Sequence, residues 1–230
     1  MLYTEDMVRM NIRNRDGKRV FYLGKGDNLT PGARDYLSRE RIGILSAETA
    51  KPKEYQLTNG AVLREKPEQM THLNGDVLVY KTAPRIRFRG AVDTLEAELL
   101  LCQLNCEKWR SELGEILALA RQLIRCDVLD EPVAEGTLCG LTPEQQRSHS
   151  HRPQDYYGQV HFMPEVTDGP VVLHLNRCRT AARAAELAAA AAFTDGDGNC
   201  TRVDILKALN RMSSMIYILM IRQRVAADNS

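Results

Sequence analysis

Apolar residues recur at three- and four-residue steps between residues 95 and 123, and this spacing constrains the fold more than any other feature. Such spacing puts the apolar side chains on one face of an α-helix. The positions that follow it are Leu95, Leu99, Cys102, Cys106, Trp109, Leu113, Ile116, Ala120 and Leu123. A bend near the sequence LNCEKW would divide the segment into two helices.

Two further long helices are expected before the C-terminus. One contains the alanine-rich stretch RCRTAARAAELAAAAAF, residues 177–193, and the other runs from about Val203 to Arg224. The second is apolar on nearly every side after Met212, which predicts the buried centre of a bundle. The stretch DGDGNCTRVD lacks the glycine and the final acidic residue of a calcium loop, so we expect a turn there. Four or more long helices with little strand signal favour a mainly α fold, an up-and-down helical bundle.

The first part of the chain has a different pattern, which predicts a small N-terminal α+β appendage over residues 1–65 and the helical bundle over 66–230. The sequences KRVFYLGKG and RIGILS have the character of strands. Between them, Thr30 is suited to cap a helix with Pro31 at its first position, because proline loses no backbone hydrogen bond there. The segment 130–170, rich in Pro, Gly and His, is expected to hold only short helices.

Charge and hydropathy exclude some classes of partner. With 31 Lys and Arg against 30 Asp and Glu, the chain has no broad basic surface for nucleic acid or anionic lipid. The longest apolar run, Met215 to Ile221, is too short to span a bilayer, and the first residues lack the apolar core of a signal peptide. We therefore expect a cytoplasmic protein whose six cysteines, none of them in a Cys-x-x-Cys pair, are buried thiols.

Three charged side chains interrupt the alanine-rich helix. Arg179 and Arg183 are four residues apart and Glu186 is three further on, so all three project from one face, which the small alanines leave open to a ligand or another subunit. The alternative is a solvated face on which an Arg183–Glu186 pair contributes only a few tenths of a kcal/mol. Asn210, in the apolar last helix, needs a partner, either on a neighbouring helix or on a ligand.

Two weaker signals lie elsewhere. The histidines, including His149 and His151, lack the spacing of a structural zinc site, so we expect surface residues there. The turn THLNGD contains Thr71 and Asn74 and precedes Lys81. A glycine-containing turn can cradle phosphates through its backbone N–H groups, but this one lacks the spacing of a P-loop.

Together, four segments resemble the ATP:cob(I)alamin adenosyltransferases, in particular the branch encoded with ethanolamine utilisation. They are LTPGARDYL, MTHLNGDVLVYKTAPRIRFRGAVDTL, RTAARAAE and DILKALNRMSSMIYILMI. The resemblance implies an enzyme that transfers the 5′-deoxyadenosyl group of ATP to cob(I)alamin, forming adenosylcobalamin and releasing triphosphate, in support of ethanolamine catabolism. The alternative is a non-catalytic protein for corrinoid binding or microcompartment assembly.

The resemblance also implies a homo-oligomer, a trimer in preference to a dimer, with ATP bound at the junction of two subunits. Arg179 and Arg183 would hold ATP or the subunit junction, and Glu186 would fix them. Asp93 would pair with Arg179 across the interface, and Asn210 would contact the nucleotide.

Two further groups are implied at the substrates. The segment from Thr71 through Asn74 to Lys81 would close over the phosphates of ATP with Mg²⁺. Phe162 would be the apolar wedge that displaces the lower ligand of the corrinoid, which leaves a cobalt centre that is easier to reduce.

The first arginine of the pattern has two candidates. The sequence LHLNR also matches the family's Leu-His-x-x-Arg, which would select Arg177 in place of Arg179. We prefer Arg179, because it shares a helical face with Arg183 and Glu186.

The chain departs from part of this branch in one possible metal site. Some relatives carry a His followed by a Cys-Cys-x-x-Cys cluster between the appendage and the bundle. The corresponding stretch here, YQLTNGAVLREKPEQMTHL, contains no cysteine, although a thiolate metal site needs several. We therefore predict a form that needs no transition metal. The resemblance implies an electron-donating reductase, such as a flavoprotein, as a partner. The sequence does not decide whether a bacterial microcompartment shell is a second partner.

Overall fold

The computed structural model describes residues 1–15, 17–46 and 54–228. The chain separates into two compact units. The first contains residues 1–55 and 62–65, and the second contains residues 56–61 and 66–230.

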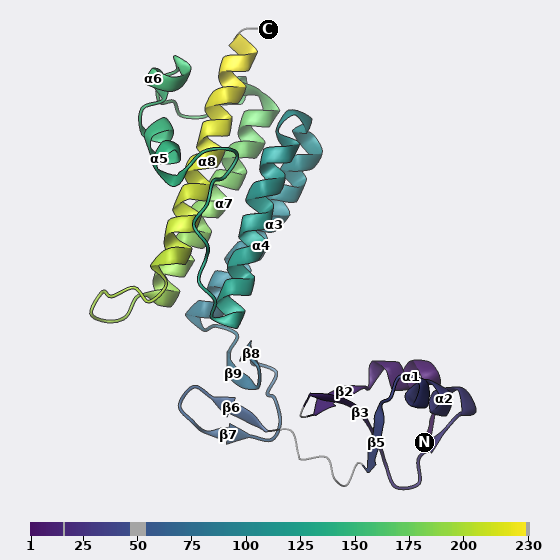
Figure 1. The fold of residues 1–230 in the computed structure, drawn as a ribbon. Helices are drawn as coiled ribbons and strands as arrows, with labels where there is room; N and C mark the ends of the chain where they lie inside the picture. The colour runs from purple at the N-terminus through teal and green to yellow at the C-terminus, as the bar shows by residue number, and fades with distance from the viewer. Residues whose placement is uncertain (16, 47–53, 229–230) are drawn as a thin grey trace. The chain divides into compact units, whose positions relative to one another are not determined.

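The N-terminal unit combines short strands with the helices α1 and α2 (Figure 1). In chain order its elements are β1 (Leu2–Tyr3), α1 (Glu5–Met10), β2 (Arg13–Arg15), β3 (Lys18–Leu23), β4 (Asn28–Leu29), α2 (Pro31–Arg39) and β5 (Gly43–Ser46), and β7 (Val62–Leu63) groups with them. Strand β3 pairs antiparallel with β2 and parallel with β5, while β1 pairs parallel with β4. Apolar side chains that include Val8, Phe21 and Leu37 give this unit a core of its own.

The start of α2 is confirmed in detail. Helix α2 begins at Pro31, and the Thr30 hydroxyl accepts a hydrogen bond from the backbone N–H of Ala33 at 3.3 Å. This cap satisfies one of the free N–H groups at the start of the helix. The strands expected from KRVFYLGKG and RIGILS are β3 and β5.

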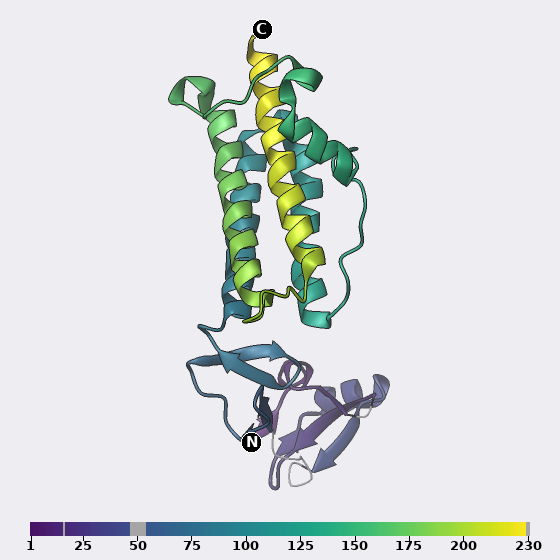
Figure 2. The same cartoon turned by 90° about the vertical axis from the view of Figure 1, so that its left-hand side faces the viewer.

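Four long helices, α3, α4, α7 and α8, run side by side in the described part of the second unit (Figures 1 and 2). Its elements are β6 (Tyr55–Leu57), β8 (Met70–Asn74), β9 (Val77–Tyr80), α3 (Pro84–Asn105), the 3₁₀ turn η2 (Glu107–Trp109), α4 (Arg110–Leu129), α5 (Pro143–His151), α6 (Pro153–Tyr157), the 3₁₀ turn η3 (Val166–Asp168), α7 (Gly169–Phe193) and α8 (Val203–Asp228). Strands β8 and β9 form an antiparallel hairpin, and β6 pairs parallel with β9. The expected mainly α bundle is therefore confirmed.

The apolar pattern that predicted the first helices also identifies their buried face. All nine positions from Leu95 to Leu123 are buried, none more than 4% exposed. The bend is confirmed as well, because α3 ends at Asn105 and a 3₁₀ turn leads into α4. At the bend, the indole N–H of Trp109 donates to Gln223 Oε1 of α8 at 2.8 Å, which ties the turn to the last helix.

Helix α3 begins earlier than the apolar positions from which it was predicted, at Pro84. Its first turns are basic, and two of the arginines find a buried acidic partner on α4. Arg85 and Arg89 each donate to a carboxylate oxygen of Asp127 at 2.6 Å, and Asp127 is fully buried. The contact with Asp127, between residues far apart in sequence, leaves no local signal. The apolar steps themselves continue into these turns, because Phe88 and Val92 are also fully buried on the same face.

The alanines of α7 partly serve a different purpose from the one expected. Ala182, Ala185 and Ala189 are fully buried, and α7 packs against α3 and α8. A small methyl side chain allows the backbones of neighbouring helices to approach closely. At these positions the alanines therefore pack within the chain, and they are not open to a ligand or a second subunit.

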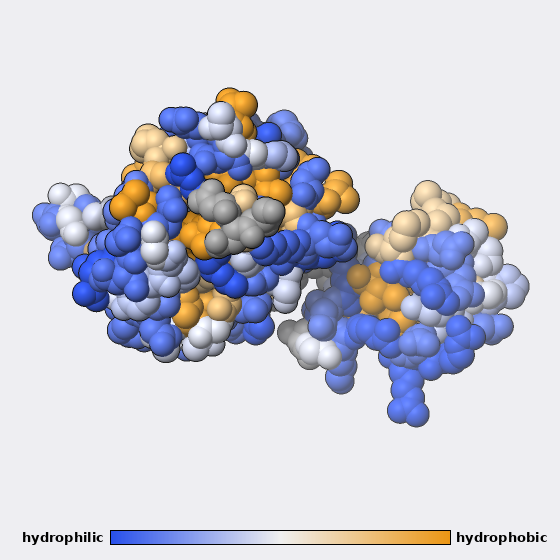
Figure 3. Space-filling view, turned by 90° about the horizontal axis from the view of Figure 1, so that it is seen from above, coloured by the Kyte–Doolittle hydropathy of each residue, from blue (hydrophilic) through white to orange (hydrophobic). Residues whose placement is uncertain are grey.

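Apolar side chains also reach the surface of the bundle. Seen from the end at which α8 terminates, they alternate with polar patches (Figure 3). The loop between α6 and α7 lies at this end, and its exposed apolar residues are Val160, Met163 and Val166. Within the described ranges, no helix combines the length and apolar character needed to cross a membrane.

Candidate functional site

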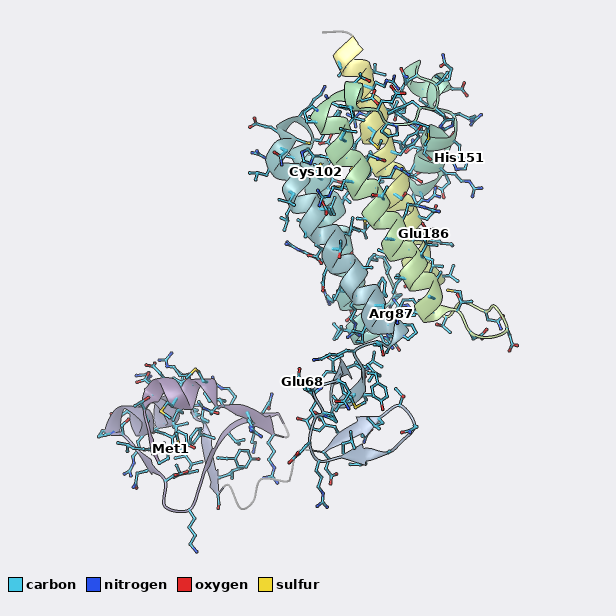
Figure 4. The ribbon with its side chains drawn as sticks, turned by 180° about the vertical axis from the view of Figure 1, so that it is seen from behind. Met1, Glu68, Arg87, Cys102, His151 and Glu186 are labelled. Carbon is cyan, nitrogen blue, oxygen red and sulfur yellow. The ribbon has the colours of Figure 1, made fainter. Side chains whose placement is uncertain are left out.

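A pocket of about 320 Å³ lies where α5, α7 and α8 meet in the second unit. Its lining residues are Ser150, His151, Arg179, Arg183, Asn210, Ser213, Ser214 and Tyr217. Figure 4 shows His151 of α5 and Glu186 of α7 beside α8, away from Arg87 near the start of α3. Three residues selected from the sequence, Arg179, Arg183 and Asn210, are therefore brought together from two helices.

A carboxylate joins the two helices beneath this pocket. Glu186 Oε2 accepts a hydrogen bond from Arg183 Nη1 at 2.7 Å, and Glu186 Oε1 accepts one from Asn210 Nδ2 at 3.0 Å. The Glu186 side chain is only 18% exposed, whereas that of Arg183 is 49% exposed. Glu186 is thus occupied on both oxygens, while Arg183 remains accessible and has further N–H donors for an anion.

Arg179 has a neutral partner. Its Nε and Nη2 both donate to Asn176 Oδ1, at 3.0 and 2.9 Å. An amide orients the guanidinium without neutralising it, so Arg179 contributes a full positive charge to the pocket. Asn176, three residues earlier on α7, was not identified from the sequence, although its i,i+3 spacing to Arg179 was a usable signal.

Arg177 lies elsewhere on the helix surface. Its Nε pairs with Glu98 Oε2 of α3 at 2.8 Å, and Arg177 does not line the pocket. Residues two apart on a helix face in nearly opposite directions, which is why Arg177 and Arg179 have different surroundings. Within one chain, Arg179 therefore lines the pocket with Arg183, and Arg177 does not.

Asn210 has the partner that its burial demanded. It donates to Glu186, and its Oδ1 accepts a short hydrogen bond from Arg211 Nη2. Burial lowers the pKa of the Arg211 guanidinium below its usual value, and the positive charge of Arg147 adds to the effect. Asn210 therefore has a partner on a neighbouring helix, and because it also lines the pocket, its contact with a ligand stays a prediction.

Four other candidates lie outside this pocket within one chain. Asp93 is exposed on α3, and among the described residues it makes no ion pair with Arg179. Thr71 and Asn74 belong to β8. Lys81 follows β9, and its ammonium pairs with Glu68 Oε1 at 2.7 Å, which lowers the pKa of that carboxyl group.

Phe162 lies next to the pocket through Tyr217. The two rings are stacked with centroids 6.1 Å apart, and the guanidinium of Arg224 covers the Phe162 ring at 4.5 Å. The hydroxyl of Tyr217, a lining residue, also hydrogen bonds His161 Nδ1 at 3.0 Å. An aromatic group thus borders a pocket whose other walls are cationic and hydroxylic.

The soft metal ligands are dispersed or buried. All six cysteines are free thiols, and four of them, Cys102, Cys106, Cys126 and Cys178, are buried. Within the part of the chain that the structure describes, no group of three or more His, Cys, Asp or Glu side chains is arranged to hold a metal ion. That the protein needs no transition metal stays a prediction to be tested on the protein.

Comparison with known proteins identifies similar chains. The family model described as "Cobalamin adenosyltransferase" matches residues 61–223. The corrinoid adenosyltransferase EutT of Salmonella typhimurium (strain LT2) is 31% identical over an alignment that covers 95% of this chain and 90% of that protein. EutT of Escherichia coli (strain K12) is 30% identical with the same coverage. No solved structure matches the chain significantly.

Proposed function

Because the chain belongs to the cobalamin adenosyltransferase family, we propose that it transfers the 5′-deoxyadenosyl group of ATP to cob(I)alamin. The products are adenosylcobalamin and triphosphate. The observation that best supports this reaction is the pocket in which Arg179, Arg183 and Asn210 meet. Two accessible arginines on one rigid helix suit a ligand that carries several phosphates, because a guanidinium binds phosphate with two parallel hydrogen bonds.

The chemistry explains why charged residues matter more than a general base. The electron pair of cob(I)alamin forms the new bond to C5′ of ATP, and the C5′–O bond breaks with its electrons leaving on triphosphate. No proton has to be removed from the nucleophile. The protein's tasks are to align C5′ with the cobalt and to stabilise charge on the leaving group. Arg179 and Arg183 supply that charge, and Glu186 holds Arg183 in place.

The residues outside the pocket are best explained by a second copy of the chain. Among the residues that the structure describes, the hydrogen-bond partner of the Arg179 guanidinium is the neutral amide of Asn176, while Asp93 is exposed on another helix. We propose that Asp93 of one subunit pairs with Arg179 of the next in a homo-oligomer, a trimer in preference to a dimer. The same junction would bring Thr71, Asn74 and Lys81 over the phosphates of ATP.

ATP is proposed to enter as its Mg²⁺ complex. Glu186, which contacts the lining residues Arg183 and Asn210, already accepts hydrogen bonds on both of its carboxylate oxygens. The lining groups are otherwise arginines, hydroxyls, an amide, a phenol and an imidazole, which fit phosphate oxygens better than they fit a hard cation. The ion would therefore be held mainly by the phosphates and would offset part of their charge.

The aromatic side of the pocket suits the corrinoid. Phe162 is proposed as the apolar group that displaces the lower ligand, and the exposed apolar residues of the same loop would face the corrin ring. An electron donor such as a flavoprotein would reduce the cobalt of the corrinoid before the transfer. Because the curated relatives are EutT proteins, we propose a role in ethanolamine catabolism, in the cytoplasm or inside a bacterial microcompartment.

An anaerobic assay tests the reaction. The purified protein is treated with a chelator, the chelator is removed, and chemically reduced cobalamin, ATP and Mg²⁺ are added. We expect the light-sensitive absorption spectrum of adenosylcobalamin to develop. Binding of ATP and corrinoid without product would favour the non-catalytic alternative. Product only after zinc or iron is restored would contradict the prediction of a form that needs no transition metal.

A further inference from the structure

Arg211 touches both walls of the pocket without lining it. Its Nη2 donates to Asn210 Oδ1 on α8, and its Nη1 donates to the carbonyl of Pro143, the first residue of α5, at 3.4 Å. Helix α5 supplies the lining residues Ser150 and His151. One planar guanidinium therefore connects the wall that carries Asn210 with the wall formed by α5.

The neighbours of Asn210 determine how its side-chain amide is oriented. The carboxylate of Glu186 only accepts hydrogen bonds, and the guanidinium of Arg211 only donates them. Asn210 lies between the two, so only one orientation of its amide satisfies both partners. That orientation turns Nδ2 towards Glu186 and Oδ1 towards Arg211.

From this arrangement we infer that Arg211 is a positioning residue for the nucleotide. It locks the amide of Asn210 and holds α5 against α8, so that the pocket is shaped for ATP before ATP arrives. The inference rests on the proposed function, because it takes ATP as the occupant. It adds a residue that does not touch the ligand but acts through Asn210.

Burial is consistent with a fixed role. The Arg211 guanidinium is partly buried and lies close to a second positive charge, that of Arg147, and both effects lower its pKa. An arginine in such surroundings remains charged at neutral pH and needs acceptors to compensate for its lost hydration. The Asn210 amide and the Pro143 carbonyl are those acceptors, which limits the freedom of the side chain.

The test compares two arginines of α8 in the full-length protein. Arg211→Met removes the bridge between the walls. Arg222→Met is the matched control, because Arg222 covers the ring of Trp109 at 4.6 Å and does not line the pocket. Calorimetric titration with MgATP should show about tenfold weaker binding for Arg211→Met and less than about a twofold change for Arg222→Met. Arg211→Lys keeps the charge but lacks the planar fork, so we expect it to bind less tightly than the unchanged protein.

Other measurements separate positioning from loss of fold. The melting temperatures of Arg211→Met and Arg222→Met should be similar, and KM for cob(I)alamin should stay the same. Unchanged ATP affinity in Arg211→Met, equal losses in both methionine variants, or full affinity in Arg211→Lys would overturn the inference. Failure of the proposed function is distinguishable in both of its forms. If the pocket does not take ATP, the unchanged protein shows no MgATP binding at all. If the protein binds ATP without catalysis, the unchanged protein forms no adenosylcobalamin while the binding comparison between Arg211→Met and Arg222→Met still applies.

Discussion

Arg183 is the side chain whose removal should affect catalysis most directly. It lines the pocket, is half exposed, and is held by Glu186 at 2.7 Å. Arg183→Ala removes donors aimed at charge that develops on the leaving triphosphate, so kcat/KM for ATP should fall about 100- to 1,000-fold. Circular dichroism should show an unchanged helical spectrum, and the rate is followed as adenosylcobalamin formed under anaerobic conditions.

Arg177→Ala is the control for that variant. Arg177 is on the same helix, but its side chain is 62% exposed and pairs with Glu98 of α3 outside the pocket. Activity within about twofold of the unchanged protein is expected. A larger loss in Arg177→Ala than in Arg179→Ala would instead assign the first arginine of the family pattern to Arg177.

At the residue scale, local spacing predicted only part of the site. The i,i+4 and i,i+3 steps from Arg179 to Glu186 were readable, because a helix places such residues on one face whatever surrounds it. The contacts of Arg211 and Tyr217 were not readable, since they depend on how α5 and the loop before α7 fold back onto α8. Asn210 was partly predictable: the sequence indicated that it needs a hydrogen-bond partner, but not which residue that partner is.

At the scale of the element, helix α7 should tolerate large side chains on one face only. Ala185 is fully buried between helices, while Ala191 is exposed on the same helix. Ala185→Leu forces extra volume into a packed core and should lower the free energy of unfolding by about 1–3 kcal/mol. Ala191→Leu should change it by less than about 0.5 kcal/mol. Urea titrations of the two variants measure both values, and equal effects would contradict the packing of α7.

The start of α8 is stabilised by a carboxylate that should make stability depend on pH. Arg202 donates to both oxygens of Asp204, at 3.0 and 2.9 Å, and the backbone N–H of Val133 donates to Oδ2 at 2.9 Å. The hydrogen bonds from Arg202 are the main reason that the pKa of Asp204 falls to about 2. Since an unfolded Asp titrates near about 3.9, the charged form favours the folded state at neutral pH.

Asp204→Asn tests that linkage. At pH 7 the variant should be less stable by about 1–2 kcal/mol, after allowance for solvent screening. The folded pKa lies below the unfolded one, so the advantage of the unchanged protein is complete above about pH 4 and disappears as pH falls towards about 2. Urea unfolding of both proteins at pH 7, 5 and 3 measures the difference. Asp197→Asn, in the exposed loop before α8, is the control and should show no such trend.

At the scale of the elements, the sequence predicted the helices of the bundle wherever buried residues recur with a helical period. The nine apolar positions from Leu95 to Leu123 and the break after Asn105 were found because packing repeats along the helix axis. The first turns of α3 also follow this period, since Phe88 and Val92 are buried on the same face, but the ion pairs of Arg85 and Arg89 with Asp127 join residues distant in sequence and could not be predicted. Periodicity reports which face is buried, but not which charged side chains form ion pairs between helices.

At the scale of the whole molecule, the residues proposed for the reaction lie in two separate parts of the chain, the pocket and the hairpin of β8 and β9. Within one chain, Arg183 and Asn210 line a pocket that Lys81 does not reach. If each site combines the pocket of one subunit with the hairpin of its neighbour, Arg183→Ala and Lys81→Ala damage different halves. Each variant alone should be nearly inactive, because every site in its homo-oligomer lacks one half.

Mixing the two variants then distinguishes shared sites from sites within one chain. When Arg183→Ala and Lys81→Ala chains are co-expressed in equal amounts and purified through two different tags, only mixed oligomers are kept, and in a trimer about one third of their junctions are intact. Adenosylcobalamin formation should recover to a comparable fraction. Co-expression of Arg183→Ala with Asn210→Ala is the control, since both changes lie in the same pocket and no junction escapes damage. If each variant alone is nearly inactive and neither mixture recovers, Lys81 acts within its own chain, because only a site built from two subunits can be repaired by exchanging them.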